Sequence, residues 1–74
     1  MIKIYGTKTC YYCSKARDYF EAKDLTYDYI DIGEDSEARK KLIEEYNIST
    51  VPFIIVNGKH IIGFDKKEIE SALA

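Results

Sequence analysis

Both cysteines of this chain lie in the segment CYYC, residues 10–13, where a short strand and its loop give way to a predicted helix. Three residues along a helix bring two side chains to the same side, so the two sulfur atoms can join. The start of a helix offers free N–H groups and a positive partial charge, which stabilise a thiolate. We therefore predict that Cys10 is the nucleophile and that Cys13, one turn deeper, is the resolving thiol. Lys8 adds a positive charge two residues before Cys10.

Three other interpretations of the pair compete with redox exchange. A structural disulfide is disfavoured because closing so short a loop removes little chain entropy. A zinc site is disfavoured because tetrahedral coordination needs four ligands and His60 is the only histidine, so no metal site is predicted. Two inert core cysteines are the third interpretation. Redox exchange accounts best for both the spacing and the placement of the two thiols.

Composition limits the partners of this 74-residue chain. Its formal net charge of −2 argues against binding to nucleic acid or to an anionic membrane surface, because both require a basic excess. No apolar run approaches the roughly 18 residues of a spanning helix, and the amino-terminal residues lack a secretory signal pattern. We therefore expect one domain, residues 1–74, in the cytoplasm, where a disulfide is usually transient and catalytic.

The hydrophobic pattern predicts four strands and three helices. Apolar residues alternate with polar ones in the first strand and recur at steps of three and four after Cys10, which is typical of an amphipathic helix. Asn57-Gly58 fits a two-residue hairpin turn, and Asp35 and Asp65 are candidate helix caps. The predicted strands are 2–5, 25–32, 53–56 and 59–62, the predicted helices are 11–23, 35–46 and 65–72, and residues 6–9 form a loop. The second helix is expected to bury Ala38, Leu42, Ile43 and Tyr46.

The order β-α-β-α-β-β-α predicts an α/β fold in which three helices cover one mixed four-stranded sheet. Strands that are separated by helices favour parallel pairing through right-handed crossovers. The closing hairpin is expected to add an antiparallel edge. This arrangement uses the whole chain and leaves no linker.

Three motifs resemble those of the glutaredoxin family, whose fold is thioredoxin-like. Residues 10–13 are similar to the family's C-P-Y-C and keep the tyrosine before the second cysteine. Thr50-Val51-Pro52 is similar to its T-V-P, and HIIGFD, residues 60–65, to its H-I-G-G-x-D. The resemblance covers the whole chain, with the three motifs at the family's separations.

The resemblance implies a monomeric enzyme, a glutathione-dependent thiol–disulfide oxidoreductase. Its substrates would be protein disulfides and glutathione mixed disulfides, and glutathione would be the co-substrate that restores the dithiol. The helix start activates the thiol, so no separate general base is expected.

The resemblance also implies a glutathione groove. The Val51–Pro52 bond is expected to be cis, with the Val51 backbone free to pair with the cysteinyl part of glutathione. The glycyl carboxylate is expected at Arg39 with help from Lys8, and the γ-glutamyl end at the start of the last helix, which is itself an anion site. The expected glutathione-binding residues are Lys8, Tyr12, Arg39, Thr50, Val51, Pro52, Gly63, Phe64 and Asp65.

This chain departs from the family's pattern in four places. Tyr11 replaces the proline of the active site, and Lys8 stands one position later than the usual lysine. Ile62 replaces the first of the two glycines in the family's H-I-G-G-x-D motif, and Lys66 stands where the family commonly has a second acidic residue after the aspartate. The first change bears on the reduction potential and the exposure of the nucleophile, and the others bear on the strength of glutathione binding.

Two alternative functions follow from these departures. One is a glutaredoxin-like redoxin that supplies electrons to ribonucleotide reductase and is recharged by thioredoxin reductase. The other is a dimer that holds a [2Fe–2S] cluster through Cys10 of each subunit and two glutathiones. Three groove residues also have a structural interpretation, since Pro52 begins a strand, Asp65 can cap a helix and Arg39 lies on a solvated helix face.

Overall fold

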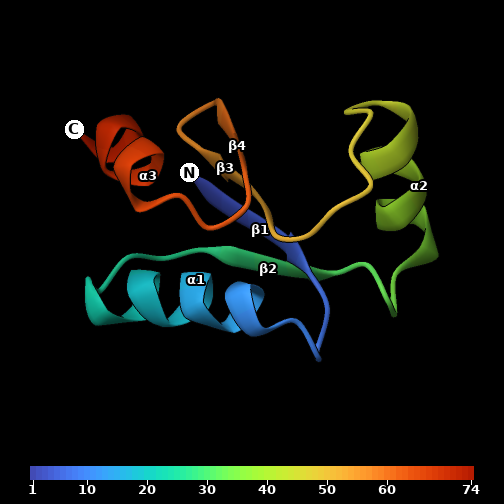
Figure 1. The fold of residues 1–74 in the computed structure, drawn as a ribbon, viewed down its shortest axis with the longest axis horizontal. Helices are drawn as coiled ribbons and strands as arrows, with labels where there is room; N and C mark the ends of the chain where they lie inside the picture. Colours follow the sequence, from blue (N-terminus) through green and yellow to red (C-terminus); the bar gives the residue numbers. More distant parts are fainter.

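The computed structural model describes residues 1–74, and its elements follow the predicted order (Figure 1). The elements are β1 (Ile2–Gly6), α1 (Tyr11–Ala22), β2 (Asp28–Asp31), α2 (Ser36–Glu44), β3 (Phe53–Val56), β4 (Lys59–Ile62) and α3 (Lys66–Leu73). The predicted β-α-β-α-β-β-α fold is therefore confirmed. No helix combines the length and the apolar character that crossing a membrane requires.

The four strands form one mixed sheet in the order β2-β1-β3-β4. β1 and β2 are parallel, as predicted, but β3 is antiparallel to β1, so the prediction of parallel pairing was wrong for β3. The nine residues of α2 extend only about 13 Å, and α2 lies beyond the carboxyl ends of β1 and β2 (Figure 1). The chain therefore re-enters the sheet at that same end, and β3 has to run in the opposite direction.

β2 is shorter than the predicted strand 25–32. Its register with β1 runs from the pair Lys3 and Asp28 to the pair Gly6 and Asp31. Pairing stops where β1 ends, so the tertiary partner sets the length of β2 and the alternating pattern of the sequence does not.

The helices cover both faces of the sheet, and each face has its own core. Residues of α1 and α3 pack on one face, and Leu42 of α2 packs on the other. Successive residues of β1 point to opposite faces, so Ile4 belongs to one core and Tyr5 to the other. The larger core consists of Ile2, Ile4, Ala16, Phe20, Ile54, Val56, Ile61 and Ile69. The smaller core consists of Tyr5, Leu42 and Phe53.

The predicted apolar stripe of α2 was wrong for Ile43. Leu42 is buried, whereas Ile43 is 46% exposed. Adjacent helical residues point about 100° apart, so a short helix that meets the sheet along one stripe cannot bury both. Ala38 and Tyr46, which are partly buried, pack against the same small core as predicted.

The predicted caps and the predicted hairpin turn are present. Asp35 accepts a hydrogen bond from the Ala38 N–H at 3.0 Å, and Asp65 accepts one from the Glu68 N–H at 3.3 Å. Asn57 and Gly58 both have positive φ, 49° and 87°, as a two-residue turn between twisted strands requires.

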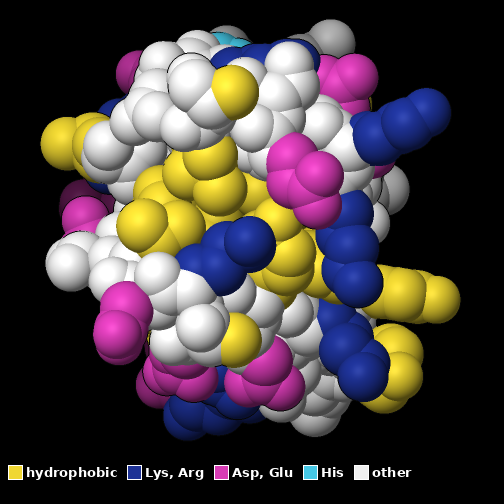
Figure 2. Space-filling model, turned by 90° about the vertical axis from the view of Figure 1, so that its left-hand side faces the viewer, with side chains coloured by type: hydrophobic (Ala, Val, Ile, Leu, Met, Phe, Trp, Pro, Cys, Tyr) yellow, Lys and Arg dark blue, Asp and Glu magenta, His cyan; other side chains and the backbone are white.

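Figure 2 views the end of the molecule that carries α3 and the amino end of β1. Hydrophobic side chains gather in the middle of this face, with charged side chains around and among them. A shallow hollow at the amino ends of β1 and β2 is lined by Met1, Ile2, Thr26, Tyr27 and Asp28. This end is remote from the cysteines, which lie beyond the carboxyl end of β1.

Candidate active site

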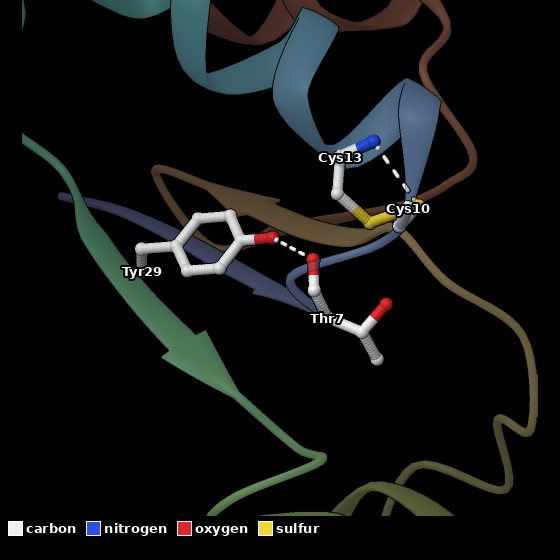
Figure 3. The surroundings of a disulfide bond; sticks show 4 residues. All are labelled: Thr7, Cys10, Cys13 and Tyr29. Carbon is white, nitrogen blue, oxygen red and sulfur yellow. Dashed lines mark hydrogen bonds between the residues drawn. A yellow bond between two sulfur atoms is a disulfide. The ribbon is translucent and has the colours of Figure 1, made fainter.

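Cys10 and Cys13 form a disulfide at the start of α1 (Figure 3). Cys10 is the residue that caps the helix, and its Sγ accepts a hydrogen bond from the Cys13 N–H at 3.2 Å. Cys10 is half-buried, whereas Cys13 is fully buried beneath it. A sulfur in the capping position receives an N–H group and the positive end of the helix, which favours its thiolate form after reduction.

Gly6 lets the buried sulfur approach the sheet. A Cβ at this position would lie 2.7 Å from Cys13 Sγ and 2.7 Å from Tyr29 Oη, far inside van der Waals contact. We expected Gly6 in the loop, but it is the last residue of β1. Our sequence prediction missed its role, although a glycine between the first strand and the CYYC segment was a visible signal.

Tyr29 is a second residue that sequence reasoning did not place at the site. Its side chain reaches from β2 toward the disulfide, and its hydroxyl donates a hydrogen bond to the Thr7 carbonyl at 2.8 Å (Figure 3). The guanidinium of Arg17 lies 5.6 Å from the centre of its ring. Burial raises the pKa of Tyr29 above its ordinary value of 10.0, while Arg17 lowers it and Asp31 raises it.

The T-V-P and HIIGFD motifs meet at the carboxyl end of β1. Phe53 pairs with Tyr5 on one side and with Ile62 on the other, so Pro52 and Gly63 lie beyond the same end of the sheet as Cys10. The Gly63 N–H donates to the Pro52 carbonyl at 2.8 Å, which joins the two motifs directly. The Val51–Pro52 peptide bond is cis, which confirms that prediction.

The residues after Gly63 have structural contacts of their own. Gly63 has φ of 80°, a conformation that glycine adopts without strain. The Phe64 ring packs edge-to-face on Tyr19 at 5.8 Å and against the larger core. Asp65 uses one carboxylate oxygen to cap α3, so its structural interpretation holds whether or not it also binds a ligand.

The other expected groove residues are exposed and lie apart from these contacts. Lys8 Nζ lies 2.8 Å from Glu34 Oε1, so the lysine is paired across the loop and does not contact Cys10. Arg39 is exposed on α2, and Thr50 is exposed just before the cis bond. Tyr12 is 60% exposed beside the disulfide, with its ring edge-to-face on that of Tyr11. The structure therefore brings the two cysteines, T-V-P and Gly63 together, and it shows no contact that ties Lys8 or Arg39 to them.

A four-stranded sheet of this topology with a C-x-x-C disulfide at the start of its first helix defines a class of protein, the thioredoxin-fold proteins. Within that class, the glutaredoxin family model matches residues 2–61 of this chain. The chain therefore belongs to the glutaredoxin family.

Two relatives show the same kinship. An uncharacterized glutaredoxin-like 8.6 kDa protein in the rubredoxin operon of Clostridium pasteurianum is 34% identical over 73 residues, which span 99% of this chain and 97% of that protein. Glutaredoxin 3 of Escherichia coli strain K12 is 30% identical over 64 residues, which span 86% of this chain and 77% of the relative.

Solved structures share the fold. The thioredoxin-like protein BC3987 superposes with a TM-score of 0.88 at 21% identity, over 97% of this chain and 99% of that one. The glutaredoxin-like NrdH-redoxin from Escherichia coli gives 0.84 at 21% identity, over 95% and 91%. A buckwheat glutaredoxin–glutathione complex gives 0.78 at 26% identity, over 97% and 71%.

Proposed function

We propose that this protein is a glutathione-dependent thiol–disulfide oxidoreductase with Cys10 as nucleophile and Cys13 as resolving thiol. The observation that carries the proposal is the position of Cys10, half-exposed at the cap of α1, with Sγ accepting the Cys13 N–H at 3.2 Å. This position favours a thiolate at the accessible sulfur and a thiol at the buried one. The kinship with glutaredoxin 3 and the likeness to a glutaredoxin solved with glutathione support glutathione as the reductant.

The reaction proceeds by two exchanges. The Cys10 thiolate attacks one sulfur of a substrate disulfide, forms a mixed disulfide and releases the other substrate sulfur as a thiolate. Cys13 then gives its proton to solvent and attacks Cys10 Sγ, which releases the reduced substrate and closes the internal disulfide. One glutathione thiolate reopens that bond as a Cys10–glutathione mixed disulfide, and a second releases glutathione disulfide.

Glutathione would lie along the end of the sheet where the motifs meet. Its cysteinyl backbone would pair with Val51, because the chain entering β3 has an unpaired edge there. Its γ-glutamyl carboxylate would accept N–H groups at Phe64 and Asp65 at the start of α3. Its glycyl carboxylate would be bound by Arg39, and by Lys8 if that lysine leaves Glu34.

A second candidate is a redoxin that is recharged by thioredoxin reductase, with ribonucleotide reductase as a partner. Ile62 favours it, because this side chain is 63% exposed at the end of β4 where the family has glycine. A branched side chain beside Gly63 takes up space at the expected γ-glutamyl site.

Two coupled assays separate the candidates. The oxidised protein is supplied with NADPH and either glutathione with its reductase or thioredoxin reductase alone, and turnover of a disulfide substrate is recorded. Glutathione-coupled turnover is the expected result. Turnover with thioredoxin reductase alone, and none with glutathione, would replace the proposal with the redoxin function.

Arg39→Ala tests the glutathione groove. A charge-assisted contact contributes about 1.5–3 kcal/mol when shielded and much less on an open surface, so in an open groove we expect a value just below the low end of that range. We therefore expect Arg39→Ala to weaken the dependence on glutathione roughly five- to tenfold, since about 1.4 kcal/mol is a factor of ten. Lys40→Ala is the matched control, because Lys40 is an exposed base on the same helix that pairs with Glu44. Equal glutathione dependence in the two variants would remove Arg39 from the site.

A further inference from the structure

The hydroxyl of Tyr29 lies close to the buried Cys13 sulfur, across the space beside Gly6. Both Cys13 Sγ and Tyr29 Oη would lie 2.7 Å from a Cβ at position 6, so the two atoms are at most twice that distance apart, on either side of the space that Gly6 leaves empty. Cys13 itself is fully buried, and no polar or charged residue is fully buried with it. The half-buried Tyr29 points its side chain from β2 toward the disulfide, and the hydrogen bond to Thr7 holds its hydroxyl in place (Figure 3).

The Tyr29 hydroxyl can act toward Cys13 only as a hydrogen-bond acceptor. Its single proton is donated to the Thr7 carbonyl at 2.8 Å, and a phenol oxygen keeps lone pairs after donating. Burial raises the pKa of Tyr29, with Arg17 acting against the rise and Asp31 adding to it, so the phenol is neutral at neutral pH. A neutral acceptor beside a buried thiol stabilises S–H and does not stabilise a thiolate.

The two redox states differ in what this acceptor can bind. In the disulfide, the Cys13 sulfur has no proton. Reduction by a dithiol transfers two electrons and two protons, the S–S bond breaks, the dithiol becomes a disulfide, and Cys13 Sγ gains an S–H group. That S–H is a donor in a buried site, where a donor without an acceptor is costly.

We propose that Tyr29 is a positioning residue that accepts a hydrogen bond from the Cys13 thiol and thereby stabilises the dithiol form over the disulfide. Tyr29 makes its bond to Thr7 in the disulfide form, and that bond does not need the Cys13 proton. The S–H bond forms only on reduction. Tyr29 therefore raises the reduction potential of the Cys10–Cys13 pair.

The proposal rests on the pair being the redox couple of the proposed function, but not on glutathione as its reductant. Wild type and Tyr29→Phe are equilibrated with mixtures of reduced and oxidised dithiothreitol, and the oxidised fraction is measured by thiol alkylation and intact mass. A net hydrogen bond contributes about 0.5–1.5 kcal/mol, so Tyr29→Phe should shift the equilibrium toward the disulfide about three- to tenfold. That shift is a potential about 15–30 mV more negative, since tenfold corresponds to 29.6 mV.

Tyr27→Phe is the matched control. Tyr27 precedes Tyr29 by two residues, and its hydroxyl donates to Glu21 at 2.8 Å, away from the disulfide. We expect its redox equilibrium to equal that of wild type. If Tyr29 acts only through Thr7, Tyr29→Phe lowers the melting temperature of both redox forms alike and leaves the equilibrium unchanged, which would overturn the proposal.

The S–H infrared band tests the same bond without changing Tyr29. In Cys10→Ser, Cys13 is the only thiol, and its stretching band should lie at the lower wavenumber of a hydrogen-bonded S–H. A band at the position of a free thiol would overturn the proposal. A protein that glutathione cannot recharge but that shows the expected potential shift would refute glutathione dependence and leave the role of Tyr29 intact.

Discussion

At position 6, a hydrogen atom is the only side chain that fits between the buried sulfur and the Tyr29 hydroxyl. The contact joins residues from β1, α1 and β2 that are far apart in the sequence, so the C-x-x-C spacing alone does not reveal it. The motif predicted which two residues react because helix geometry is local. The packing behind Cys13 could not be predicted because it depends on how β2 docks against β1.

Gly6→Ala tests that packing. Its Cβ would lie 2.7 Å from Cys13 Sγ, so the sulfur or the backbone has to move, and overpacking of this kind costs about 1–3 kcal/mol. We expect a lower free energy of unfolding by urea. Gly33→Ala is the control, because its Cβ would meet only an Asp31 carboxylate oxygen at 3.1 Å, at the end of a side chain that can rotate. Equal stability of wild type and Gly6→Ala would show that the contact is not tight.

At the scale of the elements, local signals predicted more than long-range pairing did. The capping aspartates and the Asn57-Gly58 turn both follow from a few adjacent residues. The direction of β3 was predicted wrongly, because it depends on where α2 and residues 45–52 deliver the chain. The place of Tyr29 was missed for a similar reason, since alternation within a strand says which face a residue is on and not which sulfur it meets.

The two capping aspartates allow a paired test of the groove. Asp35→Ala and Asp65→Ala each remove one cap, which costs about 1 kcal/mol and lowers the melting temperature by roughly 4–8 °C. If Asp65 also binds glutathione, only Asp65→Ala should weaken glutathione-dependent turnover, measured where both variants are folded. If both variants lose the same stability and neither changes the dependence on glutathione, Asp65 caps α3 and does not bind glutathione.

At the scale of the whole molecule, a buried tyrosine makes the free energy of unfolding depend on pH in the alkaline range. Burial raises the pKa of Tyr5 above 10.0, and the neighbouring Tyr46 and Glu45 raise it further. The unfolded chain gives up this proton near pH 10 while the folded protein keeps it, so the stabilisation is complete below about pH 10 and is lost as pH rises through the folded-state pKa.

Tyr5→Phe removes this titration. Between about pH 8 and about pH 11, the melting temperature of the disulfide form should fall less in Tyr5→Phe than in wild type. Tyr11→Phe controls for the loss of one phenol, because Tyr11 is exposed and its variant should follow the wild-type curve. If the melting temperature of Tyr5→Phe falls as steeply as that of wild type, Tyr5 does not contribute to the loss of stability at alkaline pH.

The assignment of roles to the two cysteines is tested most directly by trapping the mixed disulfide. Reduced Cys13→Ser and Cys10→Ser proteins are mixed with glutathione disulfide, and the adduct is followed by intact mass. Cys13→Ser should form a Cys10–glutathione adduct quickly and still turn over small glutathione mixed disulfides while losing protein disulfide reduction. Cys10→Ser, whose remaining thiol is buried, should do neither. Fast adduct formation and turnover by Cys10→Ser, with none by Cys13→Ser, would contradict the assignment of Cys10 as the nucleophile.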